Sequence, residues 1–520
     1  MNTFLTNFLV SHYISFIKFI YILLFYLCII NLQQLSVLFK KINMKTWIVL
    51  LVIFCSGLAL RAWAIPHLHH VYFDEFVHLN IAENIYYHNE FCITMKGGFD
   101  QIEAYDLSAW PPGYHCALAF FYSLFGETSK TAFYLSVTLG SCSIMLFFLL
   151  AYLIFKKDIP ALLCTFLFSI IPVFLKYSAS AAICATSLFF NLLALLAFLF
   201  YANLKNLKTI FLLLVALIVS VYIRPENFII MLLVLNYLAH GKKASSYFIC
   251  VIFLVLFLLP FFLQIVTIFL YMPPCGWNEG LLTHLSNFKN NFSDNLMFWF
   301  SLFHPVSYSI LAMFGYVSFK KIQPKISSFL TTWFVIFFLF YSTYHVGNFI
   351  NCPDSDRYTA NLYIPLTIFA GWGLHKLVNL FKRKKNLIFL FAVLFCSIDI
   401  LSPLKFSLKR TFMRDVYAEY NFILKCRDSV PNNLYVVTYN PAIIISVMRK
   451  KAVSMNTFFQ INPLPEKIVL FKDYWWSQNI TDFYKFEIEL KKYYAYKKIL
   501  CTETFDSEIF TFILMEKHKT

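Results

Sequence analysis

Long apolar runs alternate with short polar connections along most of this chain, and only after about residue 402 do the runs shorten. Apolar runs of about 18 residues or more with few charges predict membrane-spanning helices. We therefore predict about eleven to twelve spans, at residues 13–30, 47–64, 133–155, 160–176, 179–201, 209–223, 225–239, 247–271, 296–319, 328–345, 359–378 and 386–402. The pattern predicts an all-α polytopic membrane bundle.

Composition supports a membrane protein. The 520 residues are 60% hydrophobic and only 13% charged, whereas a soluble domain is about 45–50% apolar and about 25% charged. The 13 cysteines lie mostly within apolar runs and show no zinc-finger spacing, so they behave as small apolar residues. The net charge of +16 does not indicate a nucleic-acid partner, because the basic residues lie largely in short connections between spans.

The basic connections predict the orientation in the membrane. They fall on alternate connections and therefore on one side, and they contain Lys156 and Lys157; Lys205 and Lys208; Lys242 and Lys243; Lys320, Lys321 and Lys325; and Lys382, Arg383, Lys384 and Lys385. The positive-inside rule makes that side cytoplasmic. The chain is thus predicted to be a multi-pass membrane protein.

Three regions follow from this pattern. Residues 1–43 form an N-terminal extension with an additional span, because Met44 and Lys45 before an apolar helix resemble a natural start. Residues 44–402 form a transmembrane domain with a catalytic first outer loop at 65–114. Residues 403–520 are richer in charge, and we predict a small extracytoplasmic α/β domain there, with a helix at 414–426, strands at 434–439 and 467–471, and a hairpin at 500–516.

The first outer loop is strongly acidic. It contains the sequence VYFDEFVHL, with Asp74, Glu75 and His78, and only one basic residue, Lys96. Residues 80–87 predict a short amphipathic helix lying on the membrane. The pair Pro111-Pro112 predicts the start of another helix.

Charged residues that topology does not explain are candidates for function, because charges near a membrane are costly. On the predicted outer side they form three groups, all at the outer ends of spans. The groups are Asp74-Glu75, Arg224-Pro225-Glu226 and Asp354-Ser355-Asp356-Arg357-Tyr358. A folded bundle would bring these groups to one height.

Such a set suits sugar transfer from a lipid-phosphate donor. A carboxylate acts as general base toward an acceptor hydroxyl or amine, and removing such a base costs about 10²–10⁴-fold in rate. Arginines bind a phosphate and stabilise its charge as it departs. The pattern therefore predicts a polyprenyl-phosphate sugar donor, surrounding membrane lipids, and a lipid, glycan or protein acceptor.

These motifs, in this order and on this side, resemble the C-type-fold integral membrane glycosyltransferases. The nearest branch is the group of dolichyl-phosphate-mannose protein mannosyltransferases and aminoarabinose transferases. FDEFVH is similar to the Asp-Glu loop motif of the mannosyltransferases, with one extra residue before the histidine, and RYTANLYIPLTIFAGWGL resembles a late span of the bacterial members. The resemblance covers about residues 46–402. Because the style of the spans and loops resembles the bacterial members, it implies a bacterial inner membrane, or the endoplasmic reticulum membrane in a eukaryote.

The resemblance implies roles for individual residues. Asp74 would be the catalytic base with Glu75 as its neighbour, and Arg224 and Arg357 would face the lipid phosphate. The full set of donor-phosphate candidates is Arg224, Arg357, Tyr358 and Lys176. The accessory candidates are His78, Glu226 and Lys96.

Each candidate also has a structural alternative. Asp74 and Glu75 could be solvated loop acids, and Arg224 an interfacial anchor whose side chain reaches the headgroups. Arg357 could pair with Asp354 or Asp356, and Tyr358 could belong to an aromatic belt. Four histidines around Asp74 could hold a divalent metal ion, but His-rich interfacial loops occur more often without metal; they are His67, His69, His70 and His78.

Two other functions remain open from the sequence. A transporter or lipid flippase would need ionisable groups at mid-membrane depth and access from both sides, whereas the predicted spans are nearly free of such acids. A noncatalytic scaffold would bind a partner through its outer domain and would not depend on Asp74.

Overall fold

The structure is a computed structural model that describes residues 12–40, 42–108, 110–239, 244–271, 281–344, 347–352, 355–380, 385–409, 413–473, 480–505 and 508–518. The chain divides into two compact units. Unit 1 comprises the described residues within 1–15, 68–132 and 412–520, and unit 2 those within 16–67 and 133–411. The sequence predicted the first outer loop with the spans, whereas most of this loop clusters with the C-terminal region.

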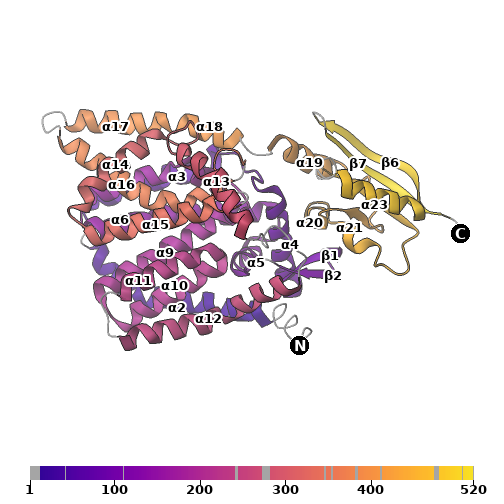
Figure 1. The fold of residues 1–520 in the computed structure, drawn as a ribbon, viewed down its shortest axis with the longest axis horizontal. Helices are drawn as coiled ribbons and strands as arrows, with labels where there is room; N and C mark the ends of the chain where they lie inside the picture. Colours follow the sequence, from indigo (N-terminus) through magenta and orange to yellow (C-terminus); the bar gives the residue numbers. More distant parts are fainter. Residues whose placement is uncertain are drawn as a thin grey trace. The chain divides into compact units, whose positions relative to one another are not determined.

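Unit 2 is helical and its helices lie side by side (Figure 1). Its α-helices are α2 (Tyr13–Phe39), α3 (Met44–Ala59), α6 (Ser129–Phe155), α7 (Asp158–Ser169), α8 (Pro172–Ser178), α9 (Cys184–Leu204), α10 (Leu207–Ile223), α11 (Phe228–Ala239), α12 (Ala244–Tyr271), α13 (Leu281–Phe298), α14 (Val306–Lys320), α15 (Pro324–Ser342), α16 (Ala360–Leu380), α17 (Lys385–Asp399) and α18 (Leu401–Lys409). Short π- or 3₁₀-helical turns adjoin them at η2 (Leu60–Ala64), η3 (Pro225–Asn227) and η4 (Ser355–Thr359).

Several of these helices have the length and composition of membrane spans. Among the described residues, five pass this test, at Tyr13–Asn31, Met44–Ala64, Lys130–Phe155, Cys184–Leu204 and Pro324–Ser342. The bent pair of α7 and α8 adds a sixth, and shorter apolar helices lie at Leu207–Ile223, Pro225–Ala239 and Val251–Val266. The predicted membrane bundle with a small α/β domain is confirmed, and the count of eleven to twelve spans stays a prediction.

Prolines account for two errors in the predicted boundaries. The span predicted at 160–176 is broken by 58° between α7 and α8, where Ile171 is extended before Pro172. The residue before a proline is disfavoured in helical geometry. The span predicted at 296–319 is wrong, because α13 ends at Phe298 and α14 begins only after the extended Pro305. Between the spans predicted at 247–271 and 296–319, the chain is helical from Leu281 onward.

Glycines allow α14 and α16 to approach closely. A Cβ atom added at Gly315 would overlap the carbonyl oxygen of Phe369, and one at Gly373 would overlap that of Leu311. Small residues let membrane helices pack with their backbones in contact. This contact fixes α16, whose N-terminal end adjoins the turn that contains Arg357.

Unit 1 is built around a seven-stranded sheet in the order β2-β1-β4-β3-β5-β7-β6. The strands are β1 (Cys92–Gly97), β2 (Ile102–Leu107), β3 (Val436–Thr438), β4 (Ala452–Ser454), β5 (Lys467–Lys472), β6 (Tyr494–Phe505) and β7 (Glu508–Lys517). Strand β3 is parallel to β4 and β5, and the other pairs are antiparallel. Because β1 and β2 come from the first outer loop, the sheet joins that loop to the C-terminal region.

Helices cover the two faces of the C-terminal strands. Ile468 and Leu470 of β5 pack with Phe483 and Leu490 of α23 (Ile480–Tyr493). The alternate residue Phe471 stacks with Phe422 of α19 (Met413–Lys425). The helix predicted at 414–426, the strands at 434–439 and 467–471, and the hairpin at 500–516 are confirmed. Three short helical segments complete the region, namely α20 (Pro441–Ile443), η6 (Ile444–Met448) and α21 (Met455–Phe458).

The acidic pair lies on a helix and not in a loop. The helix expected at 80–87 is part of the longer α4 (Tyr72–His88), whose first turn carries Asp74 and Glu75. Helix α5 (Gly113–Phe125) begins directly after Pro112, as predicted. Strand β1 is fastened to α4 because the side-chain oxygen of Asn80 accepts the backbone N–H of Thr94 at 2.9 Å.

Candidate functional site

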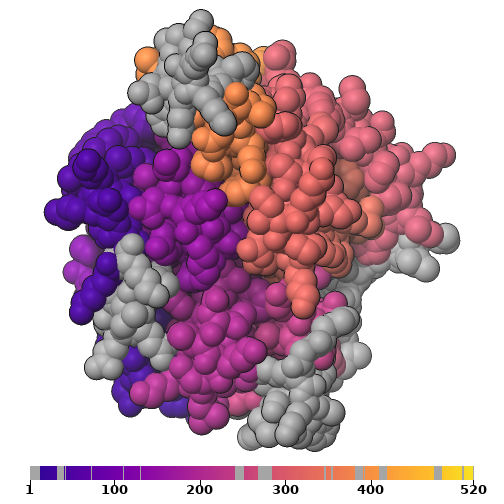
Figure 2. Space-filling view, turned by 90° about the vertical axis from the view of Figure 1, so that its left-hand side faces the viewer, coloured from indigo at the N-terminus to yellow at the C-terminus, as the bar shows by residue number. Residues whose placement is uncertain are grey.

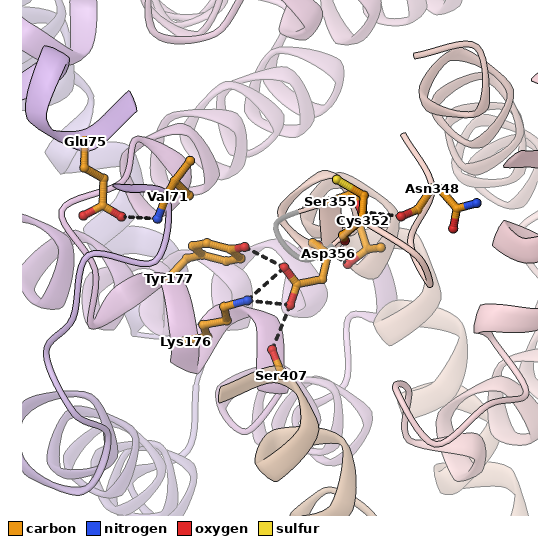
Figure 3. Close-up of polar contacts among 10 residues, drawn as sticks. Val71, Glu75, Lys176, Tyr177, Asn348, Cys352, Ser355, Asp356 and Ser407 are labelled. Atoms are coloured by element: carbon orange, nitrogen blue, oxygen red, sulfur yellow. Dashed lines mark hydrogen bonds and ion pairs between the residues drawn. The ribbon is translucent and has the colours of Figure 1, made fainter. Parts of the chain in front are cut away.

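Glu75 is a structural carboxylate at the start of α4. Its side chain is fully buried. One oxygen accepts the backbone N–H of Val71 at 2.9 Å (Figure 3). The other oxygen lies 2.8 Å from Nδ1 of His69. These contacts hold the incoming segment against the first turn of the helix. These contacts fix the position of the Glu75 side chain, and its role in catalysis stays a prediction.

Asp74 has a different environment from Glu75. It is half-buried, so part of its side chain faces solvent, and it lies in the first turn of α4. Backbone N–H groups and the helix dipole favour a negative charge at this end of a helix. Of the two adjacent carboxylates, Asp74 is thus partly accessible, whereas Glu75 is buried.

His78 connects α4 to α5. Nδ1 of His115 lies 3.1 Å from the carbonyl oxygen of Pro111, and its Nε2 lies 2.9 Å from Nδ1 of His78. A carbonyl can only accept, so Nδ1 of His115 carries the proton and Nε2 accepts from His78. Burial, together with His78, lowers the pKa of His115 well below its usual range. The contact gives His78 a role in packing, and its accessory role in catalysis stays a prediction.

Unit 2 contains a buried ion pair that the sequence did not predict. Nζ of Lys176, a fully buried residue, lies 2.9 and 3.1 Å from the two carboxylate oxygens of Asp356. The same carboxylate accepts from the hydroxyl groups of Tyr177 at 2.6 Å and Ser407 at 2.8 Å (Figure 3). Asp356 thus pairs with Lys176 and joins three separate segments, whereas the sequence offered it as a partner of Arg357. Asp354 lies outside the described residues.

The two predicted arginines meet at one tyrosine. The guanidinium carbon of Arg224 lies 5.5 Å from the ring centre of Tyr358, and that of Arg357 lies 5.1 Å from it. Nε of Arg224 also donates to Glu226 at 2.7 Å. Arg224 is extended because it precedes Pro225, and this turns its side chain out of α10. Tyr358 is buried, which contradicts an aromatic-belt position.

A network of buried amides supports this cluster. The side chain of Asn191 donates to Asn227 and Asn361, each at 2.9 Å, and Asn361 donates to the hydroxyl of Tyr341 at 3.1 Å. The network joins α9, η3, α15 and α16. Sequence reasoning missed it, because an asparagine within an apolar run carries no charge to mark it as unusual.

The remaining predicted residues have other partners. Nζ of Lys96 lies 2.8 Å from Glu103 within the β1–β2 hairpin, and this contact does not support a phosphate role. Nε2 of His67 lies 3.0 Å from the carbonyl oxygen of Arg61, and the His67 ring stacks on Phe133. Within the described part of the chain, no three His, Cys, Asp or Glu side chains are grouped as metal ligands. Whether these histidines hold a metal ion stays a question for experiment, and no step below depends on a metal ion.

Solved structures share this architecture. ArnT from Cupriavidus metallidurans in the apo state aligns over 90% of this chain and 96% of its own, with a TM-score of 0.59 at 12% sequence identity. The apo oligosaccharyltransferase of Archaeoglobus fulgidus aligns over 87% of this chain and 69% of its own, with a TM-score of 0.57 at 12% identity. No protein-family model matches the sequence, and neither does any curated protein.

The chain has the C-type glycosyltransferase fold. Further structures with this fold contain lipid phosphates. ArnT bound to undecaprenyl phosphate has a TM-score of 0.56, covering 90% of this chain and 97% of its own. Archaeal AglB from Archaeoglobus fulgidus, in complex with an inhibitory peptide and a dolichol-phosphate, has a TM-score of 0.55. The alignment covers 91% of this chain and 74% of the AglB chain. Both are 12% identical to this chain.

Within this C-type fold, a second charged cluster fastens α4 to the C-terminal region. Buried Glu83 of α4 accepts from the hydroxyl of Ser446 at 2.7 Å and lies 3.4 Å from Arg449. Arg449 also pairs with Glu127 and has a positive φ of 59°. Sequence reasoning missed this cluster, because the residues of the C-terminal region lie more than 300 residues after Glu83 and Glu127. It supports the helix whose first turn carries Asp74.

Glu83 should make the stability of unit 1 depend on pH. Burial raises the pKa of Glu83 from 4.5 to about 8, Arg449 opposes this shift and Glu127 adds to it. A raised folded-state pKa contributes stability that is complete below about pH 4.5 and declines as the pH rises toward about 8. We expect the unfolding temperature of the wild type to fall across this window more than that of Glu83→Gln, measured by thermal denaturation in detergent. Parallel curves for the two proteins would contradict the assignment.

Proposed function

We propose that this protein is an inverting glycosyltransferase. It moves a hexosyl or pentosyl group from a polyprenyl-phosphate-linked donor to a lipid, glycan or protein acceptor on the outer face of a membrane, which we take to be a bacterial inner membrane. The observation that carries the proposal is the meeting of Arg224 and Arg357 at buried Tyr358. The C-type fold is shared with proteins whose structures hold undecaprenyl phosphate or dolichol-phosphate.

The cluster in unit 2 suits an anionic ligand. Among the described residues, it contains three basic side chains and two carboxylates, namely Lys176, Arg224, Arg357, Asp356 and Glu226. A guanidinium group suits this role because it presents a planar set of donors that matches phosphate oxygens. The lipid phosphate of the donor would bind to the guanidinium groups that contact Tyr358.

The reaction then proceeds by direct displacement. Asp74 removes the proton from an acceptor hydroxyl or amine, and the acceptor atom forms a bond to the anomeric carbon. The bond between that carbon and the phosphate oxygen breaks on the opposite side, which inverts the configuration. The electron pair leaves with the polyprenyl phosphate, whose charge the two arginines stabilise. Phosphate is a good leaving group, so no strong general acid is needed.

Mass spectrometry of cellular glycolipids and glycoproteins tests the proposal. In cells lacking the gene, we expect one sugar modification to be absent and the corresponding lipid-linked sugar to accumulate, and wild-type protein should reverse both changes. A lipid-linked sugar that accumulates only on the cytoplasmic leaflet would instead indicate a flippase. Unchanged glycans and lipids in the deletion strain would overturn the proposal.

A further inference from the structure

Two neighbouring cavities lie at the end of unit 2 that carries the lysine-rich connections. The first has a volume of about 260 Å³ and lies between α6, α9, α15 and α16. The second, of about 580 Å³, lies between α9, α11 and α15. They share three wall residues, Ala202, Tyr237 and Phe329. Figure 2 shows this end of the bundle, where the magenta helices of the 150–240 region adjoin the salmon helices of the 320–340 region.

The first cavity is apolar and reaches into the bundle. Its walls include leucines and isoleucines of α6 and α16, such as Leu150 and Ile368. An aromatic group stands where the two cavities meet, with the ring centres of Phe198 and Tyr237 at 5.1 Å and those of Tyr237 and Phe329 at 5.9 Å. Such walls suit a hydrocarbon chain and offer few partners to a polar solute.

The charged residues that line the two cavities are basic. Lys156 lines the first cavity, and Lys205 and Lys325 line the second. All three residues are exposed. Among the described residues, the linings of both cavities contain lysines and no carboxylate. The charge therefore favours an anionic group beside an apolar one.

These cavities are separate from the proposed reaction site. Helix α10 has 17 residues, begins two residues after Lys205 and ends directly before Arg224. At 1.5 Å per residue it spans about 25 Å. The lysine-rich end and the arginine cluster therefore lie at opposite ends of unit 2. By the positive-inside rule the lysine-rich end faces the cytoplasm.

We propose that this double cavity binds an anionic phospholipid of the inner leaflet. The lysine ammonium groups hold its headgroup phosphate, and an acyl chain enters the apolar cavity past Tyr237 and Phe329. Basic pockets between transmembrane helices on the cytoplasmic side bind lipid headgroups in this way. The larger cavity also lies within the common range for ligand pockets, about 300–1,000 Å³.

The test is native mass spectrometry of the full-length protein in detergent, titrated with dioleoylphosphatidylglycerol or dioleoylphosphatidylcholine. We expect wild type to bind the anionic lipid at least about tenfold more tightly, since each lysine near a headgroup contributes about fivefold. The triple variant Lys156→Gln/Lys205→Gln/Lys325→Gln should lose affinity on the order of 100-fold. The matched control is Lys157→Gln/Lys208→Gln/Lys321→Gln, which changes one exposed lysine in each of the same connections outside the cavities. It should keep wild-type affinity.

A second variant tests the apolar part. Ala202→Trp fills the junction of the two cavities and should weaken binding of the lipid, with its unfolding temperature recorded as a check of folding. Equal losses in the two lysine variants, equal affinity for the two lipids, or full displacement of the lipid by millimolar inorganic phosphate would overturn the proposal.

Discussion

Replacing Asp74 with asparagine should lower the rate of sugar transfer by about 10²–10⁴-fold, the usual contribution of a general base. Asparagine keeps the size of the side chain but cannot take a proton from the acceptor. Because Asp74 is half-buried in the first turn of α4, the substitution should leave the fold intact. The rate is measured as loss of the lipid-linked sugar and gain of the glycosylated product, and the unfolding temperature is measured alongside.

Two neighbouring acids provide the comparison. Asp100→Asn changes an exposed acid of the same region and should keep full activity. Glu75→Gln keeps an acceptor for the Val71 N–H but weakens the contact with His69, so it should lower the unfolding temperature as well as the rate. If Asp74→Asn restores the missing sugar fully in a deletion strain, Asp74 is not the base, and transport or a scaffold role becomes the better account.

The periodic and apolar pattern predicted the helices well, because a span must satisfy its own backbone hydrogen bonds within one continuous segment. The α9 and α10 helices lie close to their predicted positions. The errors fall where a local residue overrides the pattern. Pro172 follows the extended residue Ile171, and Pro305 is itself extended. Each proline breaks a span that hydropathy alone treats as continuous.

The sheet could be predicted only in part. Strands β5 to β7 have the apolar, β-branched sequences that indicate strands. The strand β3 was predicted at 434–439, whereas β4 has only three residues, too few for a periodic signal. Strand β1 pairs with β4, about 350 residues later in the chain. Such a contact is fixed by tertiary packing and leaves no mark in the local sequence.

For the candidate site, too, individual residues could be predicted from the local sequence, whereas their distant partners could not. Arg224 and Arg357 were predicted from their cost near a membrane, and the structure brings both to Tyr358. The partner of Asp356 was not predicted, because Lys176 is 180 residues away and Arg357 is adjacent in sequence. Arg449, which contacts α4, lies 366 residues after its partner Glu83. A single sequence identifies charged residues whose position near a membrane is costly. It does not show which of these residues contact one another in the fold.

Replacing Lys176 with methionine should destabilise the folded chain by about 3–5 kcal/mol, the usual cost of removing one partner from a buried ion pair. Methionine fills a similar volume, but it leaves the Asp356 carboxylate buried with only the hydroxyl groups of Tyr177 and Ser407. An uncompensated buried charge costs much more than the pair contributes. The change is measured by chemical denaturation of the purified protein in detergent.

A double-mutant cycle separates this structural role from phosphate binding. Lys176→Met/Asp356→Asn removes both charges and should be more stable than Lys176→Met alone, because residues in one network are strongly coupled. Lys289→Met changes an exposed lysine of the same unit and should have little effect on stability. If Lys176 instead binds the donor phosphate, Lys176→Met would raise the KM for the lipid-linked sugar with stability unchanged, and removing Asp356 would rescue nothing. The 2.9 Å contact between Lys176 and Asp356 favours the structural role, so the arginines at Tyr358 are expected to receive the phosphate.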